Sequence, residues 1–168
     1  MTVEGRYWRM LSPKWSHEPL SGAGAARLGG RYNSPGMPAL YMSEAFATAV
    51  AEYEQDLGIR PGTLCAYQVS AAPVVDLCDP AALLAAGLTE NDLRCAWKRI
   101  AFIDKAIPPG WALARRLVAA GVAGARVPSV QMRGGVNLVL WRWNDAAERV
   151  VTALDPLGDL PKTQASWM

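Results

Sequence analysis

Five side chains spread along the sequence have types that could bind and transform a charged small molecule. They are two cations, one aromatic ring, one carboxylate and one hydroxyl: Arg9, Arg31, Tyr41, Glu52 and Ser129. A guanidinium makes bidentate contacts to phosphate, and a carboxylate stabilises positive charge that develops in a transition state. The set suits a dinucleotide, with the arginines on the pyrophosphate, the aromatic face at the nicotinamide and the carboxylate beside the ribose.

Glu52 falls in a segment that predicts a helix, with Ser43 as N-cap, an end near Leu57 and Gly58 as the stop. The expected buried stripe consists of the large apolar residues at helical spacing, Phe46, Val50, Tyr53 and Leu57. Glu52 lies off this stripe, roughly 120° from Phe46 around the helix, and the residues before it on its own face are small: Ala45, Thr48 and Ala49. Such a face lets a ligand approach closely. The alternative, which the pattern alone favours, is a solvated glutamate on a wet face.

The other candidates also have structural alternatives. Arg31 follows two glycines, which let the backbone approach an anion, but it could equally be a turn arginine in solvent. Arg9 lies in an apolar strand, where a charge needs a partner or a ligand if it points inward. For Arg9 and Tyr41 the pattern alone favours an outward-facing residue and a core residue, respectively. Ser129 is expected at a strand end, where site residues and ordinary turns are both common.

The elements that must position these residues are short. Apolar or alternating patterns predict strands at residues 6–11, 39–42, 64–70, 74–77 and 125–127. Residues 136–143 and 149–154 are predicted to pair as strands around a turn at Asn144-Asp145. Residues 12–39 are expected to form a long loop, which in a compact domain is usually functional. Residues 97–110 have no decisive pattern.

Helix signals are mixed with these strand signals. Asp79 and Pro80 are predicted to open a short helix that Gly87 ends, Thr89 to cap another, and residues 111–120 to form a longer one. The mixture predicts an α+β fold. The 168 residues are 51% hydrophobic and contain neither a repeat nor a linker, so a single compact domain over residues 1–168 is expected.

Charge and motifs exclude several function classes. Lys and Arg number 17 against 15 Asp and Glu, so the chain lacks the basic footprint of a nucleic-acid-binding domain. The lone histidine, His17, gives little support to a Ser-His-Asp triad and excludes a histidine-rich metal site. No P-loop motif occurs. The stretch from Gly22 to Arg27 approaches G-x-G-x-x-G, but Arg27 occupies the third glycine position and no strand precedes it, so a Rossmann site is rejected.

The cysteines and the termini indicate the compartment. Cys65, Cys78 and Cys95 are odd in number and form no C-x-x-C pair, so reduced, core-packed thiols are expected instead of disulfides or a zinc site. We find no signal-peptide pattern and no apolar run that could span a bilayer. The expected location is the cytoplasm, with no membrane association and no bound metal.

The order of these segments resembles the RES family, the toxins of bacterial toxin–antitoxin pairs usually encoded beside an Xre-like antitoxin. The matching stretches span nearly the whole chain: Tyr7-Trp8-Arg9, Pro19-Leu20-Ser21-Gly22, Gly24-Ala25, Gly29-Gly30-Arg31-Tyr32-Asn33, Ala39-Leu40-Tyr41-Met42, the Glu52 helix, Val127-Pro128-Ser129 and Asn137-Leu138-Val139-Leu140. The combination is specific, although no single stretch is. Trp141-Arg142 departs from the family, where Asn-Pro is common.

The resemblance implies an ADP-ribosyltransferase-like fold with mixed or antiparallel sheets, flanked by helices. It implies cleavage of the nicotinamide–ribose bond of NAD⁺, a substrate here, without a metal. The implied catalytic residues are Arg9, Glu52 and Ser129, and the implied dinucleotide-binding residues are Arg9, Arg31, Tyr32, Tyr41 and Ser129. The implied partner is an Xre-like antitoxin. The acceptor of the ADP-ribose is a protein side chain, phosphate or water.

Two other function classes stay open at this point. A binding module could recognise NAD⁺ or ADP-ribose without chemistry, although the complete set of Arg9, Glu52 and Ser129 speaks against it. A pure interaction protein could use a tryptophan-rich surface, since seven tryptophans are many for this length. Core packing is the simpler explanation for most of these tryptophans.

Overall fold

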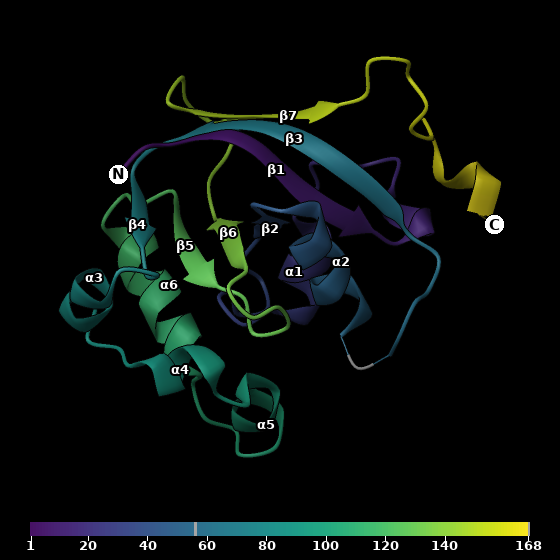
Figure 1. The fold of residues 1–168 in the computed structure, drawn as a ribbon. Helices are drawn as coiled ribbons and strands as arrows, with labels where there is room; N and C mark the ends of the chain where they lie inside the picture. Colours follow the sequence, from purple (N-terminus) through teal and green to yellow (C-terminus); the bar gives the residue numbers. More distant parts are fainter. Residues whose placement is uncertain (56, 168) are drawn as a thin grey trace.

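The computed structural model describes residues 1–55 and 57–167, whose strands form one mixed sheet with helices around it (Figure 1). In chain order the elements are β1 (Val3–Leu11), the 3-10 helix η1 (Pro13–Trp15), α1 (Ala23–Leu28), β2 (Leu40–Ser43), α2 (Phe46–Glu54), β3 (Thr63–Ala71), β4 (Val74–Asp76), α3 (Pro80–Ala85), α4 (Glu90–Arg94), α5 (Trp97–Phe102), α6 (Pro109–Ala119), β5 (Gly124–Pro128), β6 (Val136–Leu140), β7 (Arg149–Leu154) and the 3-10 helix η2 (Gln164–Trp167). The predicted α+β class, with a mixed sheet and flanking helices in one compact domain, is confirmed.

The sheet is built from two well-paired parts. Across the described residues its seven strands lie in the order β4-β5-β6-β2-β1-β3-β7. β1 pairs with β3 along its whole length, from Val3 with Ala71 to Leu11 with Thr63. By contrast, β1 and β2 share one paired position among the described residues, Trp8 with Ser43. One short pairing therefore joins β4-β5-β6-β2 to β1-β3-β7.

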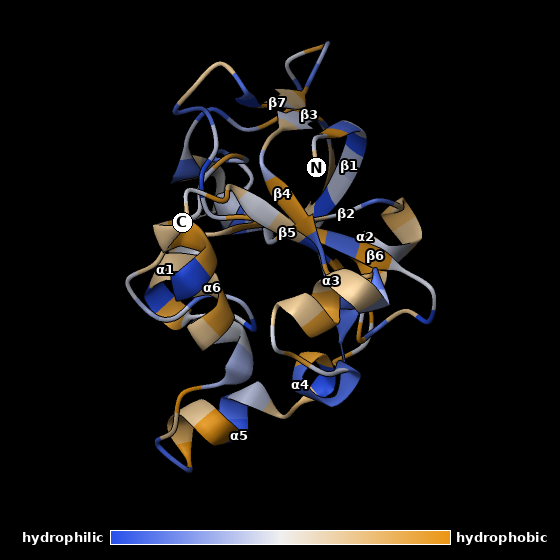
Figure 2. Cartoon of the chain, turned by 90° about the vertical axis from the view of Figure 1, so that its left-hand side faces the viewer, coloured by the Kyte–Doolittle hydropathy of each residue, from blue (hydrophilic) through white to orange (hydrophobic). Residues whose placement is uncertain are grey.

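Strand β6 separates the two hydrophobic cores. Leu138 and Leu140 belong to the cluster that packs with β1 and β3, whereas Val139 and Trp141 belong to the cluster that packs with α3, α4 and α6. Successive side chains of a strand point to opposite faces, so β6 is buried on both sides, which explains its almost wholly apolar sequence. Figure 2 shows mostly apolar residues in β4 and α3, which contribute Val75 and Leu83 to the second cluster, and both apolar and polar residues in α6.

Several predicted boundaries are confirmed by the capping contacts. The Asp79 carboxylate accepts a hydrogen bond from the Ala81 amide at 3.0 Å and so caps α3. Thr89 and Asp92 form a capping box at α4, because each side chain accepts a hydrogen bond from the backbone amide of the other. The predicted helix over residues 111–120 is α6, which begins two residues earlier at Pro109.

The predicted pairing of residues 136–143 with 149–154 is wrong. A turn does occur at Asn144, which has a positive φ of 54°, and the Asn144 side chain exchanges hydrogen bonds with the backbone of Val151. However, β2 and β5 already occupy the two edges of β6. The chain therefore crosses to the other part of the sheet, where β7 pairs with β3.

The predicted loop over residues 12–39 contains a helix, so this prediction is wrong in part. Helix α1 occupies Ala23–Leu28 and ends at Gly29, whose φ is 75°. Alanine, leucine and arginine favour helix strongly enough to outweigh the one glycine inside this segment.

The predictions for helix α2 are wrong at both ends and on its buried face. Ser43 ends β2 and does not cap the helix, which runs from Phe46 to Glu54. The chain leaves the helical conformation at Gln55, whose φ is 47°. The expected stripe is not buried as a whole, since Phe46 is 59% exposed and Leu57 75%, while Val50 and Tyr53 are half-buried. The small residues Thr48 and Ala49 are buried instead, because they let the helix lie close to the sheet.

We expect Gly110→Ala to lower the free energy of unfolding by about 1–3 kcal/mol, as overpacking does in a filled interior. Gly110 lies at the start of α6, where an added Cβ would overlap the carbonyl oxygen of Arg31. Urea denaturation measures the change. The matched control is Gly24→Ala in α1, where an added Cβ has nothing within 4 Å and the helix gains up to about 1 kcal/mol. Equal stability of the two variants would contradict this close packing.

Candidate functional site

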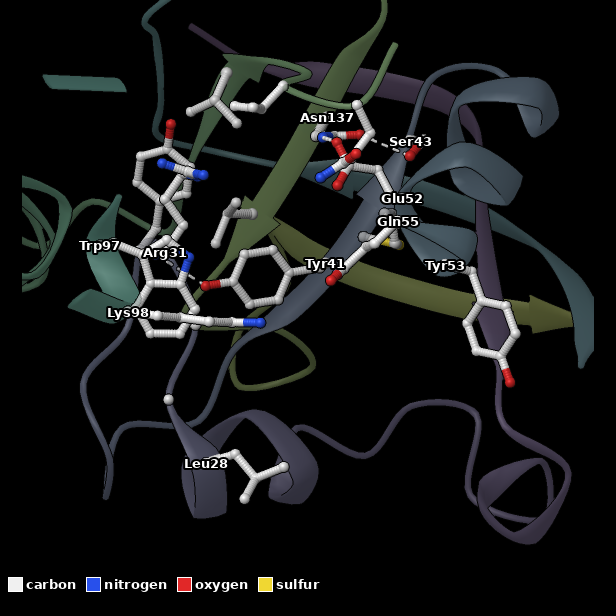
Figure 3. Close-up of a pocket in the computed structure, with 18 of the residues that line it drawn as sticks. Leu28, Arg31, Tyr41, Ser43, Glu52, Tyr53, Gln55, Trp97, Lys98 and Asn137 are labelled. Atoms are coloured by element: carbon white, nitrogen blue, oxygen red, sulfur yellow. Dashed lines mark hydrogen bonds between the residues drawn. The ribbon is translucent and has the colours of Figure 1, made fainter. Parts of the chain in front are cut away.

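A cavity of about 1130 Å³ lies at the junction of β1 and β2, where the two parts of the sheet meet (Figure 3). Its wall is formed by β1, β2, α2, the loop after α1, helix α5 and the ends of β5 and β6. Five of the predicted site residues line it: Arg9, Arg31, Tyr32, Tyr41 and Glu52. The sixth, Ser129, is buried immediately behind the Glu52 carboxylate. The fold thus brings together residues from distant parts of the chain.

The half-buried Glu52 carboxylate is held by two side-chain donors. Its Oε1 accepts a hydrogen bond from Ser129 Oγ at 2.6 Å and another from Asn137 Nδ2 at 2.6 Å. Both bonds go to the same oxygen, so within the described residues Oε2 receives no hydrogen bond from the protein. The carboxylate is therefore fixed in direction and keeps one oxygen for a ligand.

The two donors are themselves fixed. Ser129 Oγ accepts hydrogen bonds from the amides of Gln131 at 3.2 Å and Met132 at 2.9 Å, so its proton is directed to Glu52. The Asn137 side-chain oxygen accepts a hydrogen bond from Ser43 Oγ at 2.7 Å. This contact orients the amide, so that its nitrogen faces the carboxylate.

Small residues let these elements approach one another. A Cβ added to Gly135, at the end of the loop after β5, would lie 2.8 Å from the Thr48 hydroxyl of α2. The Gly135 carbonyl in turn accepts a hydrogen bond from the Ser129 amide at 2.8 Å. The small residues on this face of α2 therefore let the loop after β5 pack closely against the helix, which brings Ser129 to Glu52.

Arg9 enters the cavity from β1. Its Nη1 lies 3.4 Å from the carbonyl oxygens of both Pro19 and Ser21, which ties the guanidinium to the chain before α1. Burial lowers the pKa of Arg9, and the nearby Tyr67 partly offsets that effect. The group nevertheless remains a cation. Arg9 thus points inward and lines the cavity, which is not the outward orientation that the pattern alone favoured.

Arg31 holds the arginine loop, residues 29–33, against the C-terminal end of α4 and the residue that follows it. Its Nη1 donates hydrogen bonds to the carbonyl oxygens of Leu93 at 3.1 Å and Cys95 at 2.7 Å. Its other guanidinium nitrogens have no protein acceptor within the described residues. The side chain is therefore positioned by two backbone contacts and still has donors for an anion.

The Tyr41 hydroxyl fixes the arginine loop through two hydrogen bonds. It accepts a hydrogen bond from the Tyr32 amide at 3.1 Å and donates one to Asn33 Oδ1 at 2.7 Å. The Asn33 side-chain nitrogen then donates to the carbonyl oxygens of Ala25 and Met37. With its hydroxyl committed to this network, Tyr41 offers the cavity its ring.

Two tryptophans also hold the arginine loop in place through hydrogen bonds to its backbone. Trp111 Nε1 donates a hydrogen bond to the Gly30 carbonyl at 2.7 Å, and Trp141 Nε1 donates to the Tyr32 carbonyl at 2.8 Å. Burial raises the pKa of both Tyr32 and Tyr41, so both hydroxyls stay protonated. The Tyr32 hydroxyl is buried and has no hydrogen-bond partner among the residues that the structure describes, although the residue lines the cavity.

Positive charge dominates the cavity wall. Among the lining residues that the structure describes, one carboxylate, Glu52, stands against five cations: Arg9, Arg27, Arg31, Lys98 and Arg99. Figure 3 shows Glu52, Ser43 and Asn137 together at one end and Arg31, Trp97 and Lys98 at the other, with the Tyr41 ring between them. The arrangement suits an elongated anion with a positive or electron-poor group at the Glu52 end.

Sequence reasoning missed two sets of lining residues. Asn137 is a polar residue in an otherwise apolar strand, and this contrast was the signal that could have found it. Lys98 and Arg99 lie on α5, in the stretch where no element was predicted. Only the tertiary structure places that helix at the cavity.

Other features of the described chain bear on the expectations from sequence. No group of three or more His, Cys, Asp or Glu residues is placed there to hold a metal ion. The cysteines are free thiols, but only Cys65 is buried, so core packing is wrong for Cys78 and Cys95. None of the helices described has the length and apolar character needed to cross a membrane.

A known protein family and a solved structure resemble this chain. A family model described as the RES domain matches residues 6–163. A chain of the crystal structure of the M. tuberculosis MbcT–MbcA toxin–antitoxin complex is similar, with a TM-score of 0.67 and 21% identity over 99% of this chain and 88% of that chain. No curated protein matches the sequence.

We expect Tyr41→Phe to lower the free energy of unfolding by about 1–3 kcal/mol, because it leaves the Tyr32 amide and the Asn33 side-chain oxygen without their partner. Thermal and urea denaturation report the loss. The matched control is Tyr53→Phe, which removes an exposed hydrogen bond to the Pro61 carbonyl and costs at most about 0.5 kcal/mol. A Tyr41→Phe variant as stable as that control would show that the hydroxyl does not hold the loop.

Proposed function

The chain belongs to the RES domain family, and on that premise we propose that it is the toxin of a toxin–antitoxin pair that cleaves the nicotinamide–ribose bond of NAD⁺. The observation that carries the proposal is the Glu52 carboxylate, which is held through one oxygen by Ser129 and Asn137 and faces a cation-rich cavity with the other. A dinucleotide has the matching chemistry, since its pyrophosphate is anionic and its nicotinamide ring is cationic.

The reaction needs little from the protein beyond electrostatics and positioning. The bond between ribose C1′ and the nicotinamide nitrogen breaks, and its electron pair stays on nicotinamide, which leaves as a neutral molecule. The ribose then carries oxocarbenium character until an acceptor forms a bond to C1′ and gives up its proton. Glu52 stabilises this positive charge and holds a ribose hydroxyl or orients the acceptor.

The remaining residues position the substrate and the carboxylate. Arg9 and Arg31 bind the pyrophosphate through guanidinium nitrogens other than the Nη1 atoms that contact backbone carbonyl oxygens. Tyr41 offers its ring to the nicotinamide side, and Tyr32 lines the same cavity beside Arg31, where it is proposed to contact the substrate. Ser129 positions Glu52 through its hydrogen bond to Oε1, and because it lies behind the lining residues, its contribution to substrate binding is made through that carboxylate.

The acceptor divides the proposal into three versions. Transfer of ADP-ribose to a protein side chain is the version that we put forward, whereas phosphate or water as acceptor would make the chain an enzyme that depletes NAD⁺. Each acceptor leaves a different product: a modified protein, a phosphorylated ADP-ribose or free ADP-ribose. Product analysis therefore assigns the version directly.

An Xre-like antitoxin is the proposed partner. Its type comes from the family resemblance, and the structurally similar chain belongs to a toxin–antitoxin complex. We further propose that the pair acts in the cytoplasm, where NAD⁺ is present, and that residues 1–168 form one RES domain.

We expect Glu52→Gln to keep NAD⁺ binding but to reduce nicotinamide release by about 10²- to 10³-fold, because the amide is nearly isosteric but carries no charge. Nicotinamide release is measured with and without phosphate, and with labelled NAD⁺ in cell lysate. The matched control is Glu54→Gln, on the same helix but outside the cavity wall, which should keep full activity. Full activity in Glu52→Gln would remove this residue from the mechanism. NAD⁺ binding without release in the wild-type protein would favour a binding module.

We expect expression of the wild-type chain to stop growth of a bacterial host and to lower its NAD⁺ or to label a host protein. Glu52→Gln should be harmless, because the effect requires turnover. The measurements are colony counts and cellular NAD⁺ after induction, with equal protein levels checked by immunoblot. Growth arrest by both forms would point to a partner-binding effect and not to an enzymatic toxin.

A further inference from the structure

We propose that helix α5 holds the adenosine half of the dinucleotide, with the Trp97 ring stacking on adenine and Lys98 binding the adjacent phosphate. This inference rests on the proposed function and assigns a part of the same cavity for which the sequence supplied no residue. The nicotinamide, ribose and pyrophosphate already have partners in Tyr41, Glu52, Arg9 and Arg31.

The first support is the position of α5 along the cavity. Trp97, Lys98, Arg99 and Phe102 all line the wall, and Figure 3 shows Trp97 and Lys98 beside Arg31, at the end away from Glu52. A dinucleotide with its ribose at Glu52 and its pyrophosphate near Arg31 must extend its adenosine beyond Arg31. That direction leads to α5.

The second support is the rigid mounting of the Trp97 ring. Its centroid lies 6.0 Å from that of Phe102 and 6.3 Å from that of Trp111, at interplanar angles of 63° and 50°. Neither neighbour stacks flat against it. Trp111 is in turn bonded to the Gly30 carbonyl, so the aromatic cluster is tied to the same loop that carries Arg31. The ring is thus held in a defined place relative to the pyrophosphate residues, as a stacking platform requires.

The third support is the charge beside that ring. Lys98 Nζ lies 5.8 Å from the centroid of the Trp97 ring. Figure 3 shows the Lys98 side chain extending beneath Tyr41 towards the middle of the cavity. Arg99 pairs with Asp104 at 3.8 Å, whereas Lys98 has no carboxylate partner within the described residues. A base stacked on Trp97 would bring its own phosphate to this ammonium group.

Two smaller ligands separate the contributions of Trp97 and Lys98. AMP carries the base, the ribose and one phosphate, and adenosine lacks the phosphate. We expect Trp97→Leu to weaken binding of both ligands by about 5- to 100-fold, the loss expected for one base–aromatic stack. Lys98→Met should weaken the binding of AMP by a few-fold and leave the binding of adenosine unchanged. Titration calorimetry measures both ligands without any need for turnover.

Turnover of a truncated substrate gives an independent measurement. Nicotinamide mononucleotide contains the bond to be cleaved but no adenosine, so kcat/KM for NAD⁺ should fall in Trp97→Leu while cleavage of the mononucleotide is unchanged. Trp97→Phe, which keeps an aromatic face, should recover most of the loss. The matched control is Trp15→Leu, which removes a half-buried tryptophan outside the cavity wall and should alter neither substrate.

The outcomes distinguish this inference from the proposed function. AMP affinity that is the same in Trp97→Leu as in the wild-type protein overturns the adenosine site, and so does an equal loss for NAD⁺ and the mononucleotide. Absence of nicotinamide release from NAD⁺ in the wild-type protein overturns the proposed reaction instead. AMP binding that depends on Trp97 would then still locate the adenosine site.

Discussion

The hydrogen bonds from Ser129 and Asn137 to one oxygen of Glu52 are the constraint on which the rest of the site depends. A carboxylate taken partly out of water must receive donors in return, and here the donors come from the loop after β5 and from β6. Helix α2, that loop and β6 must therefore meet at one point. The close contact of Thr48 with Gly135 is the packing condition for this meeting, since larger side chains would hold the elements apart.

The second requirement is to bring cations to a carboxylate without neutralising it. Different elements achieve this, because Arg9 comes from β1 and Arg31 from the arginine loop, whereas Glu52 comes from α2. Arg9 and Arg31 each bond to backbone carbonyl oxygens, which carry no net charge, so the contacts that position them do not cancel their attraction for an anion. The arginine loop in turn depends on Tyr41 and Trp111. Structural tyrosine and tryptophan contacts thus set the electrostatics of the site.

Local sequence signals correctly predicted those parts of the fold whose structure depends on interactions between neighbouring residues. Asp79 and Thr89 cap helices as predicted, because a side-chain oxygen next to free backbone amides needs no distant partner. The pairing of 136–143 with 149–154 failed because strand partners are chosen over the whole sheet, and β6 was already paired on both edges. The buried face of α2 failed for a similar reason, since its neighbours required small residues such as Thr48 and not the largest apolar ones.

For the site, the sequence by itself determined the chemical types and, through the resemblance of several short stretches, the grouping of Arg9, Arg31, Tyr41, Glu52 and Ser129. It could not determine that the free oxygen of the carboxylate faces a cavity, nor that the serine lies behind it. It also gave no sign that α5 forms part of the wall. Residue identity is a property of each position, whereas orientation, burial and partner atoms arise only when segments far apart in the chain pack together.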